Sequence, residues 1–267
     1  MKTVSIVSAK GGVGKTTLSL NLAFALARRS WRTLVVDADP QGAIGHSLHK
    51  KTPSAGLAGY LAGRASLDAA IVTTRLPELA ILPIGPIAIQ DSQAFAEHLA
   101  DGKAFAALAA AAAPRFDVML VDTPCGFAGV TMGALRASDF ALAPLQAEPI
   151  ALRAMTQLLD VLAALRGEQR KVKLAGVVLT MLQLRNKESL SVAQETWAKL
   201  PPEMVLETNI PRDQIFLEAS AVGVPVGLLR QTPPPVASLF DRVAVELEPR
   251  IELTTPSRDD GPVWLLA

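Results

Sequence analysis

Cysteine, aromatic residues and excess charge of either sign are all scarce in this chain of 267 residues. The single cysteine, Cys125, excludes an intrachain disulfide and is typical of a reducing compartment. The formal net charge of +1 excludes strong overall attraction to nucleic acid, although a local basic patch is compatible with that sum. The longest apolar run, residues 104–114, is too short to cross a bilayer, and the first apolar stretch ends at Lys10, too early for a signal peptide. We therefore expect a cytoplasmic protein.

Apolar residues make up half of the chain and charged residues only 19%, which indicates a large core and excludes a disordered protein. Short β-branched runs alternate with helical stretches, the pattern of βαβ units. The expected strands are residues 3–7, 33–36, 79–84, 118–121, 140–145, 174–179 and 204–206. The expected helices are residues 16–29, 90–113, 129–137, 150–166, 188–199, 213–221 and 236–247. The pattern predicts one doubly wound α/β domain, residues 1–250, with a mostly parallel sheet covered on both faces and a loose tail at 251–267.

A glycine-rich loop joins the first expected strand to the first expected helix. Its residues are Lys10, Gly11, Gly12, Val13, Gly14, Lys15, Thr16 and Thr17. Glycines let successive backbone N–H groups turn inward around an anion, and the helix amino terminus adds partial positive charge. In such a phosphate loop, Lys15 contacts the β- and γ-phosphates and the Thr16 hydroxyl binds Mg²⁺. The usual G-x-x-x-x-G-K-[ST] pattern fails strictly, because Ala9 stands at the first glycine.

Acidic residues end two further expected strands. Asp37 and Asp39 belong to the segment D-A-D-P-Q-G, and Asp122 ends a buried strand in the manner of a Walker B acid. Ligands of open α/β sheets bind at the carboxyl edge of the strands, so these carboxylates are expected beside the phosphate loop. Asp122 is expected to hold Mg²⁺ through water. Taken alone, residues 37–42 are equally compatible with an ordinary turn at a strand end.

The string K-G-G-V-G-K-T-T resembles the deviant Walker A motif of the ParA/MinD family of P-loop ATPases, and D-x-D-P-Q-G resembles a second family segment. The resemblance covers roughly residues 2–250. It implies a Mg²⁺-dependent ATP hydrolase that forms a homodimer on binding ATP. Lys10 then corresponds to the signature lysine, which reaches the phosphates held by the partner subunit, while Gly11 and Gly12 permit the close approach.

The same resemblance assigns roles to further residues. Catalytic roles fall to Lys10, Lys15 and Asp39, with Asp39 orienting the attacking water. Metal roles fall to Thr16, Asp37 and Asp122, with Asp37 supporting the Mg²⁺ shell and the switch geometry. The segment I-P-R makes Pro211 and Arg212 the candidate base contacts. The guanine-reading N-K-x-D is incomplete because Ser189 replaces its acid, so adenine is favoured. Cys125 is compatible with a redox role or with a small loop residue, and one cysteine is too few for an iron–sulfur member.

ParA-like members position DNA or protein cargo, bind the nucleoid nonspecifically and respond to a stimulating ParB-like protein or cargo adaptor. Arg185 is the candidate DNA contact, but Ile215 replaces a second arginine of such members. The alternatives are a nucleotide-gated scaffold, a MinD-like switch on a protein or membrane surface without DNA binding, and a biosynthetic ligase or kinase. The ligase or kinase usually lacks the lysine that corresponds to Lys10. Residues 251–267 contain Pro256, Asp259 and Asp260, which oppose a membrane-binding helix.

Overall fold

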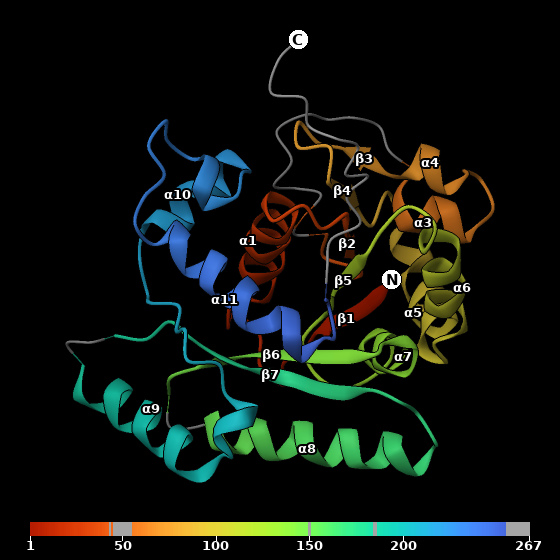
Figure 1. Ribbon diagram of the computed structural model, residues 1–267. Coiled ribbons are helices and arrows are strands. Elements are labelled where there is room, and N and C mark those ends of the chain that lie inside the picture. Colours follow the sequence, from red (N-terminus) through yellow and green to blue (C-terminus); the bar gives the residue numbers. More distant parts are fainter. Residues whose placement is uncertain (43, 45–54, 149–150, 184–185, 255–267) are drawn as a thin grey trace.

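The computed structural model describes residues 1–42, 44, 55–148, 151–183 and 186–254, and its framework is a seven-stranded sheet (Figure 1). The strand order is β3-β4-β2-β5-β1-β6-β7, and every neighbouring pair is parallel except β3 and β4. The strands are β1 (Lys2–Ile6), β2 (Thr33–Asp37), β3 (Val72–Thr73), β4 (Leu79–Leu82), β5 (Val118–Asp122), β6 (Phe140–Gln146) and β7 (Lys173–Thr180).

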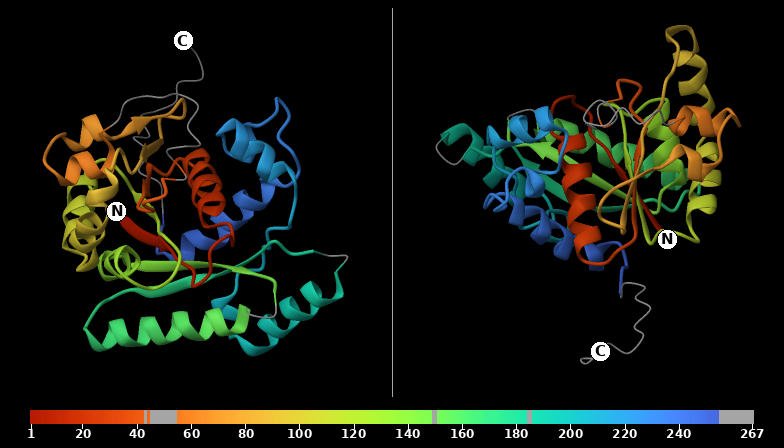
Figure 2. Two further views of the ribbon diagram at one scale, coloured as in Figure 1. Left: turned by 180° about the vertical axis from the view of Figure 1, so that it is seen from behind. Right: turned by 90° about the horizontal axis from the view of Figure 1, so that it is seen from above.

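Helices cover both faces of this sheet (Figures 1 and 2). One face packs against α1 (Lys15–Arg28), α10 (Ile215–Val222) and α11 (Ala237–Arg250). The opposite face packs against α5 (Ser92–Ala100), α6 (Lys103–Ala112), α7 (Val130–Ala137), α8 (Ala151–Gly167) and α9 (Lys187–Lys199). Neighbouring residues of the central strands point into different clusters, as Val35 and Val36 of β2 do. The expected doubly wound α/β fold is confirmed.

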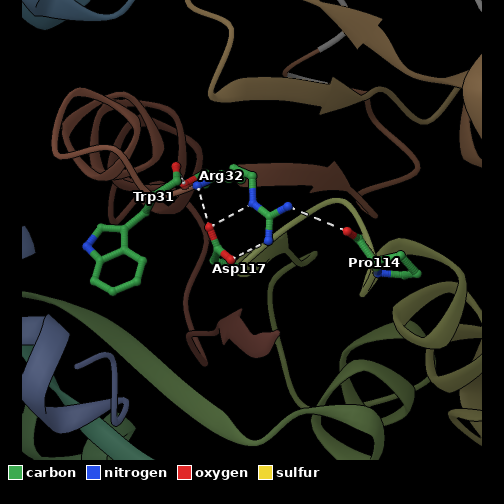
Figure 3. A network of polar contacts seen from close by, with 5 residues as sticks. Trp31, Arg32, Pro114 and Asp117 are labelled. Carbon is green, nitrogen blue, oxygen red and sulfur yellow. Dashed lines mark hydrogen bonds and ion pairs between the residues drawn. The ribbon is translucent and has the colours of Figure 1, made fainter. Parts of the chain in front are cut away.

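An ion pair at the amino-terminal edge of the sheet fixes the register of the two strands that end in acids (Figure 3). Arg32 donates from Nη2 to Asp117 Oδ1 at 2.7 Å and from Nε to Asp117 Oδ2 at 3.1 Å. The backbone N–H of Arg32 also donates to Asp117 Oδ2, at 3.0 Å. Because β2 and β5 are equally long and start in register, Asp37 lies directly opposite Asp122 at the carboxyl edge.

The helix expected over residues 90–113 is wrong as one element, because it is divided into a 3₁₀ turn (Ile89–Asp91), α5 and α6. The break lies at Gly102, whose φ of 83° is open to glycine at little cost. A Cβ on Gly102 would stand 2.8 Å from the carbonyl oxygen of Gly133 in α7. The close approach of α7 therefore requires a glycine at this break. The apolar periodicity of the sequence did not reveal that requirement.

The strand expected at residues 204–206 is also wrong. Pro202–Met204 form a 3₁₀ turn, and Val205 makes only an isolated bridge to Val177 of β7. The N–H of Val205 donates to the carbonyl of Pro202 at 3.3 Å, so the turn takes up a donor of the expected strand. The short elements α3 (Gly56–Leu61), α4 (Leu67–Ala70), β3 and the 3₁₀ turn Val226–Leu228 were not expected, because each is too brief to show a period.

The tail expected from residue 251 begins with residues that pack on the domain. Ile251 is fully buried, and the carboxylate of Glu252 contacts Lys2 Nζ at 2.7 Å and Lys173 Nζ at 3.0 Å. Residues 255–267 lie outside the described part of the chain. Within that part, no helix has the length and apolar character needed to span a membrane.

Substituting Gly133 by alanine tests the packing of α7 on α5. A Cβ there would stand 1.8 Å from the carbonyl oxygen of Leu99, which is backbone and cannot rotate away. Gly133→Ala is therefore expected to lower the free energy of unfolding by about 1–3 kcal/mol, as overpacked cores do. Urea denaturation followed by circular dichroism measures the change.

Gly167→Ala is the matched control, because Gly167 ends α8 and a Cβ there meets nothing within 4 Å. Alanine should leave that helix unchanged or stabilise it by about 0.5–1 kcal/mol. Equal unfolding free energies for the two variants would contradict the close approach of α5 and α7.

Candidate functional site

The loop between β1 and α1 has backbone N–H groups that donate no hydrogen bond to another described residue. Gly12 and Gly14 have φ angles of 76° and 91°, the left-handed conformation that turns successive N–H groups inward. No N–H group from Gly11 to Gly14 donates to another described residue. The amino terminus of α1, which begins at Lys15, adds its partial positive charge. The loop is therefore built to receive an anion.

Lys15 supplies a buried cation to this loop. Its side chain is 8% exposed, and Nζ donates to Ser8 Oγ at 3.0 Å. The Ser8 hydroxyl in turn donates to the carbonyl of Lys10, at 2.7 Å. Within the described residues, Lys15 has no acidic partner. Because a buried ammonium group is costly unless a negative group faces it, the geometry favours an anionic ligand here.

Asp122 lies next to Thr16 at the carboxyl end of β5. Asp122 Oδ2 accepts a hydrogen bond from Thr16 Oγ1 at 2.7 Å, and Oδ1 accepts one from Ser19 Oγ at 3.0 Å. Burial raises the pKa of Asp122 to about 6, although the two hydroxyl hydrogen bonds and the charge of Lys15 oppose the shift. The structure thus brings two of the predicted metal-binding side chains together. Hydroxyl and carboxylate oxygens are the ligands that Mg²⁺ prefers.

The two acids that follow β2 occupy different positions. Asp37 is fully buried, and its carboxylate accepts from the N–H groups of Asp39 at 3.2 Å and Ile44 at 3.1 Å. It therefore holds the start of the segment after β2. Asp39 is half-buried, its Oδ1 accepts from the N–H of Gln41 at 2.9 Å, and its negative charge contributes to the raised pKa of Asp122. Asp39 therefore lies near Asp122 and is more exposed to solvent than Asp37.

The side chain of Lys10, at the start of the glycine loop, forms an ion pair with Glu148. Its Nζ lies 2.6 Å from Glu148 Oε2, just beyond the end of β6, and the side chain is 47% exposed. Sequence reasoning missed Glu148. The available signal was its position just after a strand, at the same edge of the sheet as Asp37 and Asp122.

A cavity of about 400 Å³ continues from the loop toward α10. Pro211 and Arg212 line it, so the predicted base contacts do lie beside the phosphate loop. Thr180 and Met181, at the end of β7, also line it. The lining residues that were not predicted as contacts are Leu18, Ile210, Asp213, Gln214, Phe216, Leu217, Ser220 and Phe240. The Thr180 hydroxyl donates to the carbonyl of Val13 at 2.9 Å, which ties β7 to the loop. Mostly apolar walls around a few polar groups suit a flat heterocycle.

A wider depression of about 770 Å³ lies on the other side of Pro211. Its lining contains three acidic residues, Glu207, Asp241 and Glu246, against one basic residue, Arg242. That charge opposes a polyphosphate, so the smaller cavity beside Lys15 is the candidate site. The predicted DNA contact Arg185 lies outside the described residues, and the position of Ile215 is buried.

A family model and individual proteins both match most of this chain. The family model described as AAA domain matches residues 1–174. The chromosome partitioning protein ParA of Caulobacter vibrioides is 34% identical over 237 residues, covering 85% of this chain and 86% of that protein.

Solved structures with the same fold include those of two proteins that are 26% identical to this chain. The cell division ATPase MinD of Pyrococcus furiosus is 26% identical with a TM-score of 0.74, over 93% of this chain and 98% of that one. Cobyrinic acid a,c-diamide synthase of Mycobacterium smegmatis, solved with an ATP analogue and magnesium, is 26% identical with a TM-score of 0.75, over 92% and 93%. With the phosphate loop and the strand-end acids in place, the chain belongs to the ParA/MinD family of P-loop ATPases.

Proposed function

We propose that the chain is a ParA-like ATPase that dimerises on ATP and hydrolyses it to ADP and phosphate, and so positions DNA or a protein cargo. The observation that carries the proposal is that the two lysines of the loop, Lys10 and Lys15, differ in burial and in their partners. Lys15 is buried within the loop and forms no ion pair with an acidic residue in the described part of the chain, whereas Lys10 is half-exposed and pairs with Glu148. A loop that binds a triphosphate alone needs only the first lysine. The second lysine is accessible from outside the protomer, which supports a role toward a neighbouring molecule.

The phosphate end of the site has a proposed role for each side chain. Backbone N–H groups of Gly11, Gly12, Val13 and Gly14 donate to phosphate oxygens, and Lys15 neutralises the β- and γ-phosphates. Bound Mg²⁺ would neutralise charge that develops on the phosphate oxygens. Thr16 and Asp122, already in contact at 2.7 Å, would hold it, with Thr17 beside them on α1. Asp37 would support this shell by fixing the segment after β2.

Hydrolysis requires a water molecule in line with the bond that breaks. The water oxygen bonds to the γ-phosphorus, the bond from that phosphorus to the bridging oxygen breaks, and ADP, phosphate and a proton are released. Asp39 is the side chain proposed to orient this water, because its half-buried carboxylate lies close enough to Asp122 to contribute to the raised pKa of that acid. Pro211 and Arg212 would contact the adenine in the cavity of about 400 Å³.

A partner protein completes the proposal. A ParB-like protein or a cargo adaptor would stimulate hydrolysis, and nonspecific DNA would bind the ATP dimer through phosphate contacts that are individually weak and sensitive to salt. Arg185 is the proposed DNA contact, and association with the nucleoid would follow from it.

One observation favours a second candidate function, a nucleotide-gated switch that acts on a protein or membrane surface without binding DNA. Ile215 stands where some relatives use an arginine, and here it is the first residue of α10 and is buried in the core. A mobility-shift assay at low salt, with duplex DNA and the dimer trapped by a nonhydrolysable ATP analogue, separates the two. DNA of reduced mobility supports the ParA-like function, and DNA of unchanged mobility supports the switch that does not bind DNA.

Replacing Lys15 by alanine removes the buried cation. The loss of charge-assisted hydrogen bonds to phosphate is expected to weaken ATP binding by about 100-fold or more. Isothermal titration calorimetry measures this affinity. Lys103→Ala is the control, since that lysine is 90% exposed and distant from the loop. Wild-type affinity in Lys15→Ala would refute the assignment of the phosphate loop.

Asp39→Ala should separate binding from hydrolysis. Without a group to orient water, phosphate release is expected to fall by about 10²- to 10⁴-fold, while the ATP-bound dimer accumulates because it is no longer consumed. Phosphate release and multi-angle light scattering measure the two quantities. A variant that remains monomeric with ATP would contradict the proposed role of Asp39.

The raised pKa of Asp122 predicts a pH dependence for the nucleotide-free protein. Between its ordinary value of 3.8 and about 6, the folded state binds more protons than the unfolded state, so stability decreases as pH rises through this window. The full change is on the order of 3 kcal/mol, from about 1.4 kcal/mol per pKa unit. Urea denaturation of wild type and Asp122→Asn from pH 4 to 7 should show the extra slope only in wild type. Parallel curves would contradict the raised pKa.

A further inference from the structure

The ion pair of Lys10 belongs to a small network at the end of β6. Glu148 Oε2 lies 2.6 Å from Lys10 Nζ, and Glu148 Oε1 accepts a hydrogen bond from Gln146 Nε2. The backbone is fixed as well, because the N–H of Ala147 donates to the carbonyl of Thr180 at 3.1 Å. Both carboxylate oxygens of Glu148 are therefore engaged, and these contacts orient the carboxylate toward Lys10 of the phosphate loop.

This contact neutralises Lys10 within its own protomer. The two side chains are 47% and 39% exposed, so the pair is accessible from outside and is weaker than a buried pair. A lysine that serves a neighbouring molecule must leave this carboxylate first. A triphosphate can compete for it, because it offers several negative oxygens against the single charge of Glu148.

We propose that Glu148 is a positioning residue, which holds Lys10 in the unpaired protomer and releases it to the triphosphate of a second copy of this chain. The inference rests on the proposed function, in which Lys10 acts across the dimer. Glu148 thereby sets how much nucleotide charge is needed before two protomers close. Loss of the γ-phosphate reduces the competing charge, and the return of Lys10 to Glu148 then favours separation of the protomers.

The size of the effect follows from the exposure of the pair. Half-exposed ion pairs shift an equilibrium by about 1.5- to 5-fold each. A symmetric dimer breaks two such pairs, so removing both should strengthen dimerisation by about 2- to 25-fold. A residue that merely supported the fold would weaken dimerisation when replaced, so the direction of the change distinguishes the two roles.

Glu148→Gln tests the proposal, because it keeps the size of the side chain and removes its charge. The dissociation constant of the dimer is measured by sedimentation velocity with magnesium and adenylyl imidodiphosphate. The matched control is Glu195→Gln, which breaks the exposed pair of Glu195 with Lys199 in α9, at 3.3 Å. We expect dimerisation about 2- to 25-fold tighter in Glu148→Gln and unchanged in Glu195→Gln.

A second measurement addresses Lys10 directly. Competitive acetylation without nucleotide, quantified by mass spectrometry, should label Lys10 faster in Glu148→Gln than in wild type, because the amine is no longer held by a carboxylate. Lys199 in the same samples should react equally in both.

The outcomes distinguish the positioning role from the proposed function. A dimer in wild type that is unchanged or weaker in Glu148→Gln overturns the positioning role and leaves the dimer intact. Unchanged acetylation of Lys10 also overturns that role. Wild type that stays monomeric with the nucleotide analogue overturns the proposed function, and the positioning role with it.

Discussion

The buried ammonium group of Lys15 is the constraint around which the site is arranged. It is 8% exposed, its hydrogen-bond partner is the neutral hydroxyl of Ser8, and it has no acidic partner among the described residues. A buried ammonium group without an ion pair is costly, which favours an anionic ligand at this point. The open N–H groups of the glycine loop and the amino terminus of α1 surround the same point, so three independent sources of positive potential converge there.

The sheet brings negative charge close to this point, although no acidic residue in the described part of the chain forms an ion pair with Lys15. The pair of Arg32 with Asp117 aligns β2 with β5, and that register places Asp37 opposite Asp122. Asp122 is engaged by the hydroxyls of Thr16 and Ser19 rather than by the lysine. The site thus combines an anion-binding loop with a carboxylate and hydroxyl pair suited to a divalent cation. These are the complementary requirements of a magnesium–nucleotide complex.

The fold, and the meeting of the phosphate loop with the strand-end acids, could be predicted from the sequence because both depend on local patterns. The glycine spacing, the strand before the loop and the acid at a strand end are each visible within a short stretch of the chain. What depends on tertiary contact was missed. Glu148 gains its importance only from the approach of Lys10, 138 positions away, and the break at Gly102 is imposed by the packing of α7. The strand expected at residues 204–206 failed because a 3₁₀ turn that begins at Pro202 accepts the N–H of Val205, and the apolar character of the segment does not reveal that turn.

The chain shares its fold with cobyrinic acid a,c-diamide synthase as well as with MinD, so fold alone does not decide between a switch and a ligase. The proposed role of Lys10 across a dimer would distinguish the switch from the ligase. The most direct measurement is a crystal structure of the Asp39→Ala protein with ATP and magnesium. Two protomers facing each other, with Lys10 Nζ of each in hydrogen-bond contact with phosphate oxygens held by its partner, is the predicted result. A lone protomer with Lys10 still on Glu148, above a fully bound nucleotide, would contradict the proposed dimer.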